Sequence, residues 1–360
     1  MNILHLQYAG KTGGIEKLSK DIGLASKDDN NIFMFVHEGG VLCEEMKAAG
    51  LNVQEHSFEN RNILGLYKTI NKMVENYKID VIIIHHPAPL IWMSCLLYAN
   101  KKKRAKLIVY VHNSYAEIVK FNMLRKGIYD YLLKKSDYII AISKFVKSTV
   151  LENTKISNEK ISVIYNGVNV SSYKTTESSH ELPIKLIYVG RLIPEKGVQV
   201  LIKAMALLEN KKDYILDIVG DGYYKKELES LVQKLDLHSN VKFLGNQRDI
   251  PQRLQSADIF VHPAIWEEGF GITIVEAMSS GLVCIAFDKG AISEIIDNNI
   301  NGFIVSEDTA ESLALKIKEV KEIFNKEKGR FIREQAIVKS REFTIEKLVD
   351  QLHNLYENLC

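Results

Sequence analysis

Two acidic residues, Glu268 and Glu276, stand on either side of a glycine-rich segment in the second half of this 360-residue chain. Gly269 and Gly271 between them permit a tight turn, and residues typical of a helix follow from about Ile272. The free backbone N–H groups of such a turn, with the positive end of the helix dipole, attract an anion. Carboxylates do not bind phosphate, but they accept hydrogen bonds from sugar hydroxyls. The spacing therefore predicts a site for a nucleotide sugar.

Each carboxylate taken alone also has a structural interpretation, since Glu276 fits a solvated helix residue and Glu268 fits a helix cap. The two lie eight residues apart, or roughly two helical turns, so they flank the turn instead of crowding it. The combination of both carboxylates with the glycine turn favours the binding site.

Two basic residues, Arg191 and Lys196, follow another expected strand, Ile184–Val189. The turn after a parallel strand is where ligands bind in such sheets. Each charge-assisted hydrogen bond to phosphate contributes roughly 1.5 to 3 kcal/mol, and the attraction grows as charge develops on a departing diphosphate. A surface ion pair with Glu195 is the alternative interpretation of Arg191.

The first half of the chain contains a second glycine-rich turn. Gly10–Thr12 follows a strand and invites comparison with a P-loop, but His5 stands where that pattern needs its first glycine. What remains is Gly13 and Gly14 opening a helix that has Glu16 in its first turn, which offers a second set of backbone donors. An ordinary turn between strand and helix fits the same residues.

His112 follows the expected strand Leu107–Val111, so we expect it at the carboxyl edge of a sheet. A lone histidine at a strand end more often has a structural role. His85 and His86 end another strand, and the sequence assigns them no role beyond lining the same edge.

Short β-branched segments alternate with longer amphipathic ones, which indicates parallel sheets covered by helices on both faces. The expected strands are Ile3–Gln7, Ile32–His37, Asn52–His56, Val81–His85, Leu107–His112, Tyr138–Ile142, Ser162–Ile164, Ile184–Val189, Tyr214–Val219, Val241–Leu244, Ile259–Val261, Val283–Phe287 and Gly302–Val305. The series restarts after the polar segment Ser171–Glu181, and Ala310–Leu359 is expected to be helical throughout. The fold class is therefore α/β, with two doubly wound domains whose ligand sites lie at strand ends and in a cleft between them.

Composition excludes several classes of protein. Hydrophobic residues make up 46% and charged residues 26% of the chain, which excludes a disordered or collagen-like protein. Four cysteines without paired spacing exclude a disulfide framework and favour a reducing compartment. The N-terminal residues lack a secretory signal pattern. The apolar stretch Val81–Ala99 contains two histidines and two prolines, so a strand and a helix explain it better than a membrane span.

Basic residues are concentrated between Ala99 and Lys147, where 12 of them face three acidic residues. The basic region comprises Lys101–Arg104, Lys120, Arg125, Lys126, Lys134 and Lys135, around a helical stretch with the apolar residues Ile118, Phe121, Met123, Leu124, Ile128 and Leu132. This mixture favours peripheral contact with an anionic membrane, although a solvated helix face fits equally well. Nucleic acid is not an expected partner, because no aromatic platform or recognition motif accompanies the lysines.

The segment Glu268–Glu276 resembles the E-x7-E signature of the retaining family 4 glycosyltransferases of the GT-B fold. Other segments match in the family's order along nearly the whole chain. They are Gly13–Glu16, His112–Asn113, Ile142–Ser143, Tyr165–Val168, Tyr188–Leu192, Glu195–Gly197, Val219–Gly222, Phe243–Gly245, Ser279–Val283 and Gly302–Phe303. The resemblance implies two Rossmann-like domains facing a deep cleft. Residues 1–170 would form the acceptor domain, 171–182 a linker, 183–340 the nucleotide-sugar donor domain, and 341–360 a helix that crosses back to the N-terminal domain.

The resemblance also implies roles for individual residues. The implied catalytic residues are His112, Arg191, Lys196 and Glu268, with His112 near the reacting carbon of the donor sugar and the two cations on the diphosphate. The implied donor-binding residues are Gly13, Gly14, Arg191, Lys196, Gly220, Glu268, Gly269, Phe270, Gly271, Ile272, Glu276 and Glu294. The implied acceptor-side residues are Glu16, His112 and Asn113. Glu294 fits equally a charge at a helix N-terminus, and Asn113 and Asn169 depart from the aspartate common in relatives, which affects acceptor or hinge details.

A member of this family is expected to move a sugar from a nucleotide-diphosphate sugar, with UDP as the favoured nucleotide, to a glycan or lipid-linked glycan with retention of anomeric configuration. The expected setting is cell-surface polysaccharide synthesis, in the cytoplasm or at the inner face of the membrane. No Asp-x-Asp triplet occurs in the sequence, so neither a metal nor another cofactor is expected. An epimerase or phosphorylase on the same fold and a non-catalytic glycan- or nucleotide-binding subunit are the alternatives.

Overall fold

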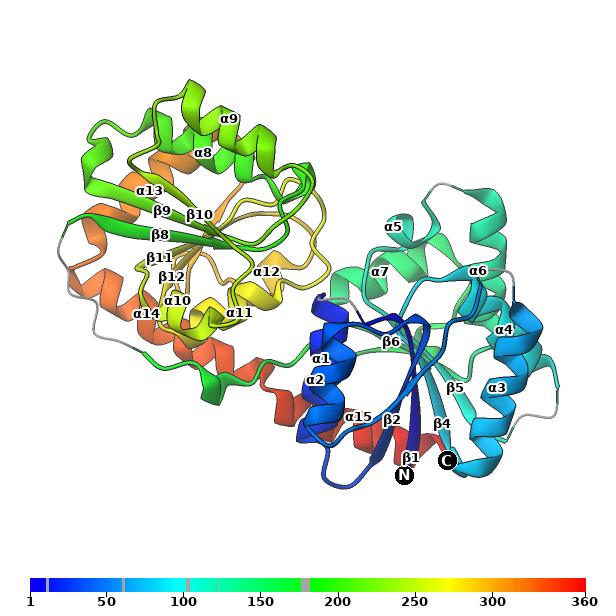
Figure 1. The fold of residues 1–360 in the computed structure, drawn as a ribbon. Helices are drawn as coiled ribbons and strands as arrows, with labels where there is room; N and C mark the ends of the chain where they lie inside the picture. The colour runs from blue at the N-terminus through cyan, green and yellow to red at the C-terminus, as the bar shows by residue number, and fades with distance from the viewer. Residues whose placement is uncertain (11–12, 60–61, 102–103, 121, 176–181) are drawn as a thin grey trace. The chain divides into compact units, whose positions relative to one another are not determined.

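The computed structural model describes residues 1–360 apart from 11–12, 60–61, 102–103, 121 and 176–181. The described residues form two compact units. The first consists of Met1–Gly167 and Ile345–Cys360, and the second of Val168–Thr344. Each unit is a twisted sheet covered by helices (Figure 1).

The first unit is built on a sheet whose seven described strands are all parallel, in the order β3-β2-β1-β4-β5-β6-β7. The strands are β1 (Asn2–Ala9), β2 (Asn30–Glu38), β3 (Asn52–Glu55), β4 (Val81–Ile84), β5 (Lys106–Val111), β6 (Tyr138–Ala141) and β7 (Ile161–Val163). The strand order reverses between β1 and β4, and ligands of doubly wound sheets bind at the carboxyl edge beside such a reversal.

Helices cover both faces of this sheet. They are α1 (Gly14–Ala25), α2 (Val41–Ala48), α3 (Ile63–Asn76), α4 (Pro89–Asn100), α5 (Tyr115–Val119), α6 (Met123–Lys135), α7 (Lys144–Asn153), the short η1 (Asn158–Lys160) and α15 (Ile345–Leu359). α1, α2 and α15 lie on one face, and α3, α4 and α6 lie on the other (Figure 1).

The C-terminal helix α15 is part of the first unit although the whole second unit precedes it in the sequence. It packs against α1 and buries Leu348, Leu352 and Tyr356. His353 Nδ1 lies 3.0 Å from Asp29 Oδ2, next to β2. These contacts tie the two ends of the described chain into one core.

The second unit repeats the architecture with six described parallel strands in the order β10-β9-β8-β11-β12-β13. The strands are β8 (Ile184–Val189), β9 (Tyr214–Val219), β10 (Val241–Gly245), β11 (Ile259–His262), β12 (Val283–Phe287) and β13 (Phe303–Val305). The helices are η2 (Val170–Ser172), η3 (Pro194–Lys196), α8 (Val198–Leu207), η4 (Lys211–Asp213), α9 (Lys225–Lys234), α10 (Ile250–Gln255), α11 (Ile272–Ser279), α12 (Ile292–Ile295), α13 (Ala310–Ile323), α14 (Glu327–Ser340) and η5 (Arg341–Phe343). Here the strand order reverses between β8 and β11.

The predicted α/β class with two Rossmann-like sheets is confirmed, and each predicted strand is present. The apolar stretch Val81–Ala99 forms β4 and most of α4, as expected. No helix in the described part of the chain has both the length and the apolar composition that a bilayer span requires.

Two segments predicted as continuous helix are interrupted. The helix is interrupted between α5 and α6. Lys120 adopts a left-handed conformation that ends α5. The Asn122 side chain accepts a hydrogen bond from the Arg125 N–H and caps the start of α6. The C-terminal segment likewise divides into α13, α14 and α15.

The units meet at different residues from the domain limits expected at 170 and 340. The Val168 N–H donates to the Phe343 carbonyl at 2.9 Å, and Val168 forms a β-bridge with Thr344. The two segments that connect the units are therefore bonded to each other at the edge of the second unit. Residues 176–181 of the expected linker lie outside the described residues.

Candidate active site

The reversal of strand order between β8 and β11 brings together residues that are far apart in the sequence. Lys196 ends η3 after β8, His262 ends β11, and Glu268 follows six residues later. The three side chains meet because the carboxyl ends of parallel strands share one edge of a sheet. Lys196 and Glu268 are predicted site residues, whereas His262 is not.

The Glu268 carboxylate is held from two sides. Its Oε2 lies 2.5 Å from Lys196 Nζ and 3.1 Å from His262 Nε2. Burial alone would raise the pKa of Glu268, but the charge of Lys196 and the hydrogen bond from His262 keep that pKa well below its usual range. Glu268 is therefore an ionised hydrogen-bond acceptor whose side chain is largely shielded from solvent. Because an ammonium group has three donors, Lys196 is able to keep this contact and also donate to a phosphate.

The predicted glycine turn is present and leads into α11. Gly271 has a φ of 100°, a conformation that glycine adopts readily and other residues rarely. Gly269 lies in the bend just before it. Within the described residues the backbone N–H groups of Gly271, Ile272 and Thr273 have no hydrogen-bond acceptor. Such groups at a helix start donate readily to an anion.

Neighbouring residues fix the backbone of this turn. Phe270 is buried and packs edge to face against Phe343, with ring centroids 5.3 Å apart. The Ala291 N–H donates to the Glu268 carbonyl at 2.9 Å. Gly290 has a φ of 63°, and a Cβ at this position would lie 2.3 Å from the same carbonyl oxygen. The loop before α12 therefore presses on Glu268 so closely that only glycine fits at position 290.

Both structural alternatives for the two glutamates are wrong. Glu276 lies on α11 with 3% of its surface exposed, so it is not a solvated helix residue. Glu268 does not cap α11, because Gly271 occupies that position. Glu294 is half-buried in the first turn of α12, where its N–H donates to the Ala291 carbonyl.

Arg191 and Gly220 lie at the ends of neighbouring strands. Arg191 is exposed after β8, and the ion pair with Glu195 considered from the sequence does not form within the described residues. The Arg191 carbonyl accepts a hydrogen bond from the Tyr188 hydroxyl at 2.9 Å. The Gly220 N–H donates to the Gly245 carbonyl, which closes the loop after β9.

In the first unit, the glycine turn is tied to a histidine. Gly13 is the N-cap of α1, and Gly14 is its first residue. Glu16 Oε1 lies 3.0 Å from His86 Nε2, while the Tyr8 N–H donates to His86 Nδ1 at 3.4 Å. His86 therefore carries its proton on Nε2 and donates it to Glu16. The structure thus links a predicted acceptor-side residue to a histidine that the sequence left without a role.

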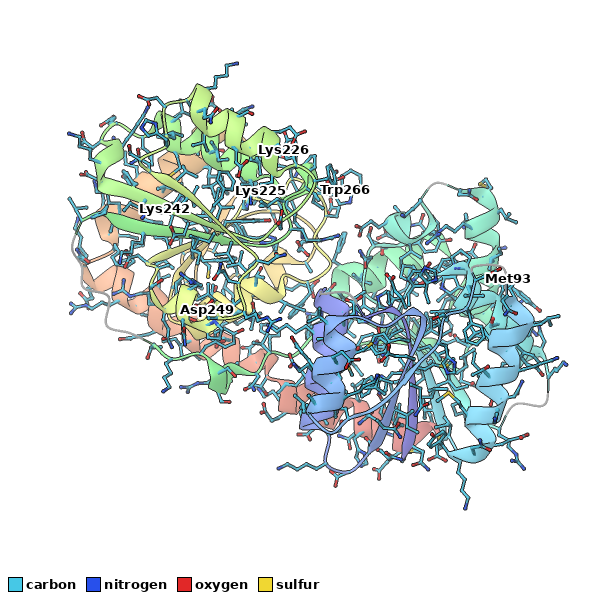
Figure 2. The ribbon with its side chains drawn as sticks, viewed as in Figure 1. Met93, Lys225, Lys226, Lys242, Asp249 and Trp266 are labelled. Carbon is cyan, nitrogen blue, oxygen red and sulfur yellow. The ribbon has the colours of Figure 1, made fainter. Side chains whose placement is uncertain are left out.

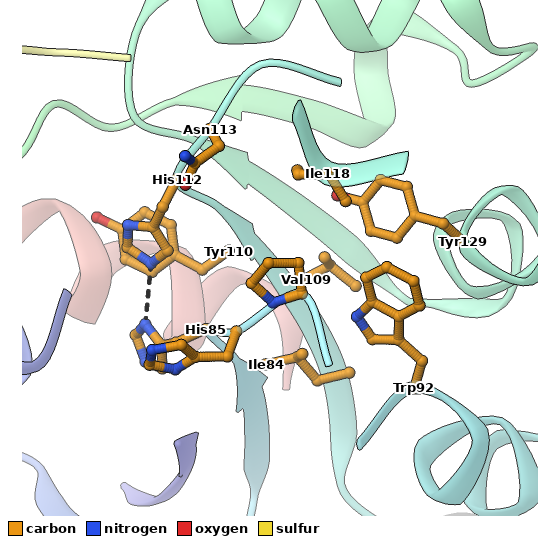
Figure 3. Close-up of a pocket in the computed structure, with 11 residues that line it drawn as sticks. Ile84, His85, Trp92, Val109, Tyr110, His112, Asn113, Ile118 and Tyr129 are labelled. Carbon is orange, nitrogen blue, oxygen red and sulfur yellow. Dashed lines mark hydrogen bonds between the residues drawn. The ribbon is translucent and has the colours of Figure 1, made fainter. Parts of the chain in front are cut away.

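A small pocket lies at the carboxyl ends of β4 and β5, lined by residues that include His85, His112 and Asn113 (Figure 3). His85 Nδ1 lies 3.1 Å from His112 Nε2, as the dashed line in Figure 3 marks. The Asn113 side chain donates to Glu117 Oε2 at 2.8 Å, which orients its amide.

The hydrogen bond between His85 and His112 continues into the sheet. His85 Nε2 lies 2.9 Å from His5 Nδ1, and His5 Nε2 lies 2.7 Å from Asn31 Oδ1. Burial lowers the pKa of His5 to about 4 and that of His112 to about 3, with the nearby His86 contributing to the second shift. Burial and the neighbouring histidines lower the pKa of His85 as well. These three imidazoles are therefore neutral at physiological pH.

Of the two site histidines that the sequence missed, His262 and His5, only His262 carries a weak signal. His262, like His112, stands at the end of an apolar strand, and a polar residue there faces the ligand edge of a parallel sheet. His5 stands inside β1, and only its partners on other strands show what it does.

The basic region is partly structural. Ile118 and Leu132 are buried, and the Arg125 guanidinium donates to the carbonyls of Ile118 and Pro87. Met123 and Leu124, at the start of α6, are 80% and 76% exposed. Lys11, Thr12, Lys102, Lys103 and Phe121 lie outside the described residues.

The described residues hold few groups suited to redox or metal chemistry. Cys43, Cys95 and Cys284 are buried free thiols, and Cys360 is an exposed one. Among the described residues no group of three or more histidine, cysteine or acidic side chains is arranged to hold a metal ion.

The sequence matches two family models. Residues 173–337 match the model described as "Glycosyl transferases group 1", and residues 36–172 match "Glycosyltransferase Family 4". An uncharacterized glycosyltransferase of Methanocaldococcus jannaschii is 30% identical over 299 residues, which cover 82% of this chain and 80% of that protein. The UDP-Gal:alpha-D-GlcNAc-diphosphoundecaprenol alpha-1,3-galactosyltransferase of Escherichia coli is 24% identical over 345 residues, covering 85% of this chain and 84% of the relative.

Two solved structures resemble the whole chain. Anabaena HepE in complex with UDP has a TM-score of 0.88 and 25% identity, and the match covers 99% of this chain and 100% of that one. A glycosyltransferase from Rickettsia africae has a TM-score of 0.87 and 26% identity, with 99% and 98% of the two chains covered.

Replacing Lys196 by Met should raise the pKa of Glu268, because the carboxylate keeps its burial and loses its nearest positive charge. A carboxyl-carbon NMR titration of protein labelled at glutamate would measure this pKa. Lys226→Met, at an exposed position of α9 labelled in Figure 2, should leave it unchanged. An unaltered Glu268 pKa in Lys196→Met would contradict the ion pair.

The three neutral histidines make a pH-dependent contribution to stability. Their folded pKa values lie below the 6.5 of an unfolded histidine, so the unfolded chain binds more protons once the pH falls below about 6.5. The free energy of unfolding should therefore fall from pH 6.5 towards pH 4, by about 1.4 kcal/mol per pH unit for each proton taken up.

Denaturant unfolding at a series of pH values would measure that slope. His5→Phe should reduce it by about one proton. His238→Phe, whose side chain is 73% exposed in the wild type, should have no such effect. Equal slopes in wild type and His5→Phe would show that His5 is not held neutral.

Proposed function

The chain belongs to the glycosyltransferases that combine the family 4 and group 1 domains, and from that membership we propose that it transfers a sugar from a UDP-sugar to a glycan or lipid-linked glycan with retention of anomeric configuration. The proposed setting is the synthesis of a cell-surface polysaccharide, in the cytoplasm at the inner face of the membrane. The name of the Escherichia coli relative supports a lipid-linked acceptor, and the HepE complex supports UDP as the nucleotide.

The observation that carries this proposal is the pairing of Lys196 with Glu268 beside the N–H groups of Gly271 and Ile272, for which the described part of the chain provides no acceptor. The N–H groups and Lys196 would hold the diphosphate, and Arg191 would add a second cation. Glu268 and Glu276 would accept hydrogen bonds from hydroxyls on either side of it. Negative charge develops on the diphosphate as the bond to the sugar breaks, so these donors bind the transition state more strongly than the substrate.

The same residues support a reaction that needs no metal ion. Basic side chains and a helix start would stabilise the departing diphosphate without a cation bridge. With the leaving group held on one face, the acceptor hydroxyl would attack that same face, which retains the anomeric configuration. A double displacement would need a carboxylate nucleophile on the opposite face.

Three alternatives on the same fold need to be separated from sugar transfer. A phosphorylase or epimerase on this fold would act on the same sugars without releasing nucleoside diphosphate in an acceptor-dependent way. A non-catalytic subunit would bind ligand without turnover, but such a subunit has less need of Lys196, Glu268 and Glu276 together. Acceptor-dependent release of nucleoside diphosphate separates transfer from all three.

Incubation with a panel of UDP-, GDP- and ADP-sugars tests the proposed function. We expect turnover or binding with a UDP-sugar, and UDP release that requires a glycan acceptor. Neither binding nor turnover with any donor in the panel would overturn the proposal, and binding without transfer across many acceptors would favour the non-catalytic subunit.

Lys196→Ala and Glu276→Gln should each lower kcat/KM by about 100-fold or more, because each removes a contact to the diphosphate or the sugar. Lys226→Ala and Glu227→Gln, both exposed on α9, serve as matched controls and should retain wild-type rates. Circular dichroism would establish that the variants stay folded. Wild-type activity in Lys196→Ala would remove the basis of the assignment.

Contact with an anionic membrane is the second part of the proposal. Met123 and Leu124 project from the start of α6 with little protein around them, and Lys120 beside them is exposed. Exposed apolar side chains flanked by cations insert at the boundary between lipid headgroups and acyl chains.

Vesicles that contain phosphatidylglycerol should bind the protein at low ionic strength, and the double variant Met123→Ser, Leu124→Ser should bind several-fold more weakly. Cosedimentation measures the bound fraction. Leu315→Ser on α13, where Leu315 is 69% exposed, is the matched control. Equal binding of both variants and wild type would exclude this surface as the contact.

A further inference from the structure

Four buried polar side chains of the first unit form one continuous row of hydrogen bonds. The row runs from Asn31 to His5, then to His85, and ends at His112, with separations of 2.7, 2.9 and 3.1 Å. Figure 3 shows its last link, where His85 and His112 line the pocket. The row therefore connects the interior of the sheet with the pocket at the carboxyl ends of β4 and β5.

The register of the parallel strands explains why these residues meet. Phe33 lies beside His5, and Asn31 comes two residues before Phe33 on β2. Ile83 lies beside His5 on the other side, and His85 comes two residues after Ile83. Ile84 pairs with Val109 in the β4–β5 register. Just beyond this pair the rings of His85 and Tyr110 lie 5.3 Å apart, and His112 comes two residues after Tyr110. Steps of two residues keep every side chain on one face of the sheet.

The orientation of one amide sets the position of every proton in the row. Asn31 Nδ2 donates to the Asp29 carbonyl at 3.3 Å, so Asn31 Oδ1 faces His5 and accepts from it. His5 then carries its proton on Nε2. The reversed amide would set its oxygen against the Asp29 carbonyl oxygen, which is repulsive.

The remaining protons follow from charge neutrality. A neutral imidazole carries one proton, so His5 Nδ1 is a bare acceptor and must receive a hydrogen bond from His85 Nε2–H. His85 Nδ1 is then also bare and receives a hydrogen bond from His112 Nε2–H. The pKa of each of the three histidines is lowered, which supports the neutral state.

Other charged groups near the row do not disturb this order. Asp29 is the nearest acid to His5, but the Met1 ammonium and His353 hold its two carboxylate oxygens. The Glu16 carboxylate is already engaged in a hydrogen bond with His86 Nε2. A metal ion does not fit among the three histidines, since their ring nitrogens are directed at one another and not at a common point.

We propose that Asn31, His5 and His85 are positioning residues that hold His112 as the Nε2–H tautomer, so that its Nδ1 lone pair accepts a hydrogen bond from a sugar hydroxyl bound at this pocket. Nδ1 of His112 has no protein donor among the described residues. The use of the lone pair rests on the proposed glycosyltransferase function, whereas the tautomer is a property of the free protein.

The tautomer is directly measurable by NMR of protein labelled with ring-15N histidine. We expect wild-type His112 to show a protonated Nε2 and an unprotonated Nδ1. His5→Phe, which keeps a ring beside Phe33 but removes the acceptor for His85, should leave His112 as a mixture of tautomers. Gln7→Met, a buried polar change on the same strand, should leave the tautomer unchanged.

Ligand titrations and kinetics complete the test. A UDP-sugar or a glycan acceptor should shift the His112 Nδ1 resonance, and UDP alone should not. A shift with the UDP-sugar alone would assign the hydroxyl to the donor, and a shift that requires the glycan acceptor would assign it to the acceptor. No shift with either would overturn this use of Nδ1. His5→Phe should lower kcat about tenfold with KM unchanged, whereas Gln7→Met should not.

The outcomes separate this inference from the proposed function. A protonated Nδ1 on wild-type His112, or the same tautomer in wild type and His5→Phe, would overturn the positioning role even if the enzyme is active. Failure of every UDP-sugar to turn over would overturn the function while leaving the tautomer assignment intact.

Discussion

The ion pair between Lys196 and Glu268 is the interaction on which the site in the second unit depends. It joins the turn after β8 to the loop after β11, the two strands between which the order reverses. A carboxylate with so little exposure is stable only when such partners compensate for lost hydration. His262 supplies the second partner, and Gly290 and Ala291 fix the backbone behind it.

Much of the fold could be predicted from the sequence, because it depends on local pattern. Buried parallel strands such as β4 and β12 are apolar on both faces and bounded by turns, and each strand had a recognisable segment. The sequence did not predict the break between α5 and α6, because the break depends on a left-handed backbone conformation at Lys120 that lysine rarely adopts. The unit boundary at Val168 depends on a hydrogen bond to Phe343, a partner 175 positions away.

Residues of the candidate site could be predicted from the sequence only where they lie close together in the chain at a recognisable spacing. Glu268, Gly271 and Glu276 follow one another in the chain, so their proximity could be read directly. His5 acts through contacts across the strands of the first unit, and no local pattern distinguishes it from other buried histidines. His262 contacts Glu268 in the second unit, and its place at a strand end is only a weak signal. The pairing of Lys196 with Glu268 was likewise hidden, because the sequence suggests a separate ligand for each. Register, not residue type, determines such contacts.

The placement of α15 has a consequence for how the molecule is made. Every residue of the second unit leaves the ribosome before this helix does, although the helix completes the core of the first unit. During translation the first sheet therefore lacks α15 while the second unit forms, and the part of its apolar face that α1 and α2 do not cover stays exposed. The nascent chain is most exposed to chaperones and to aggregation in that interval, and ribosomal pausing after Thr344 would lengthen it.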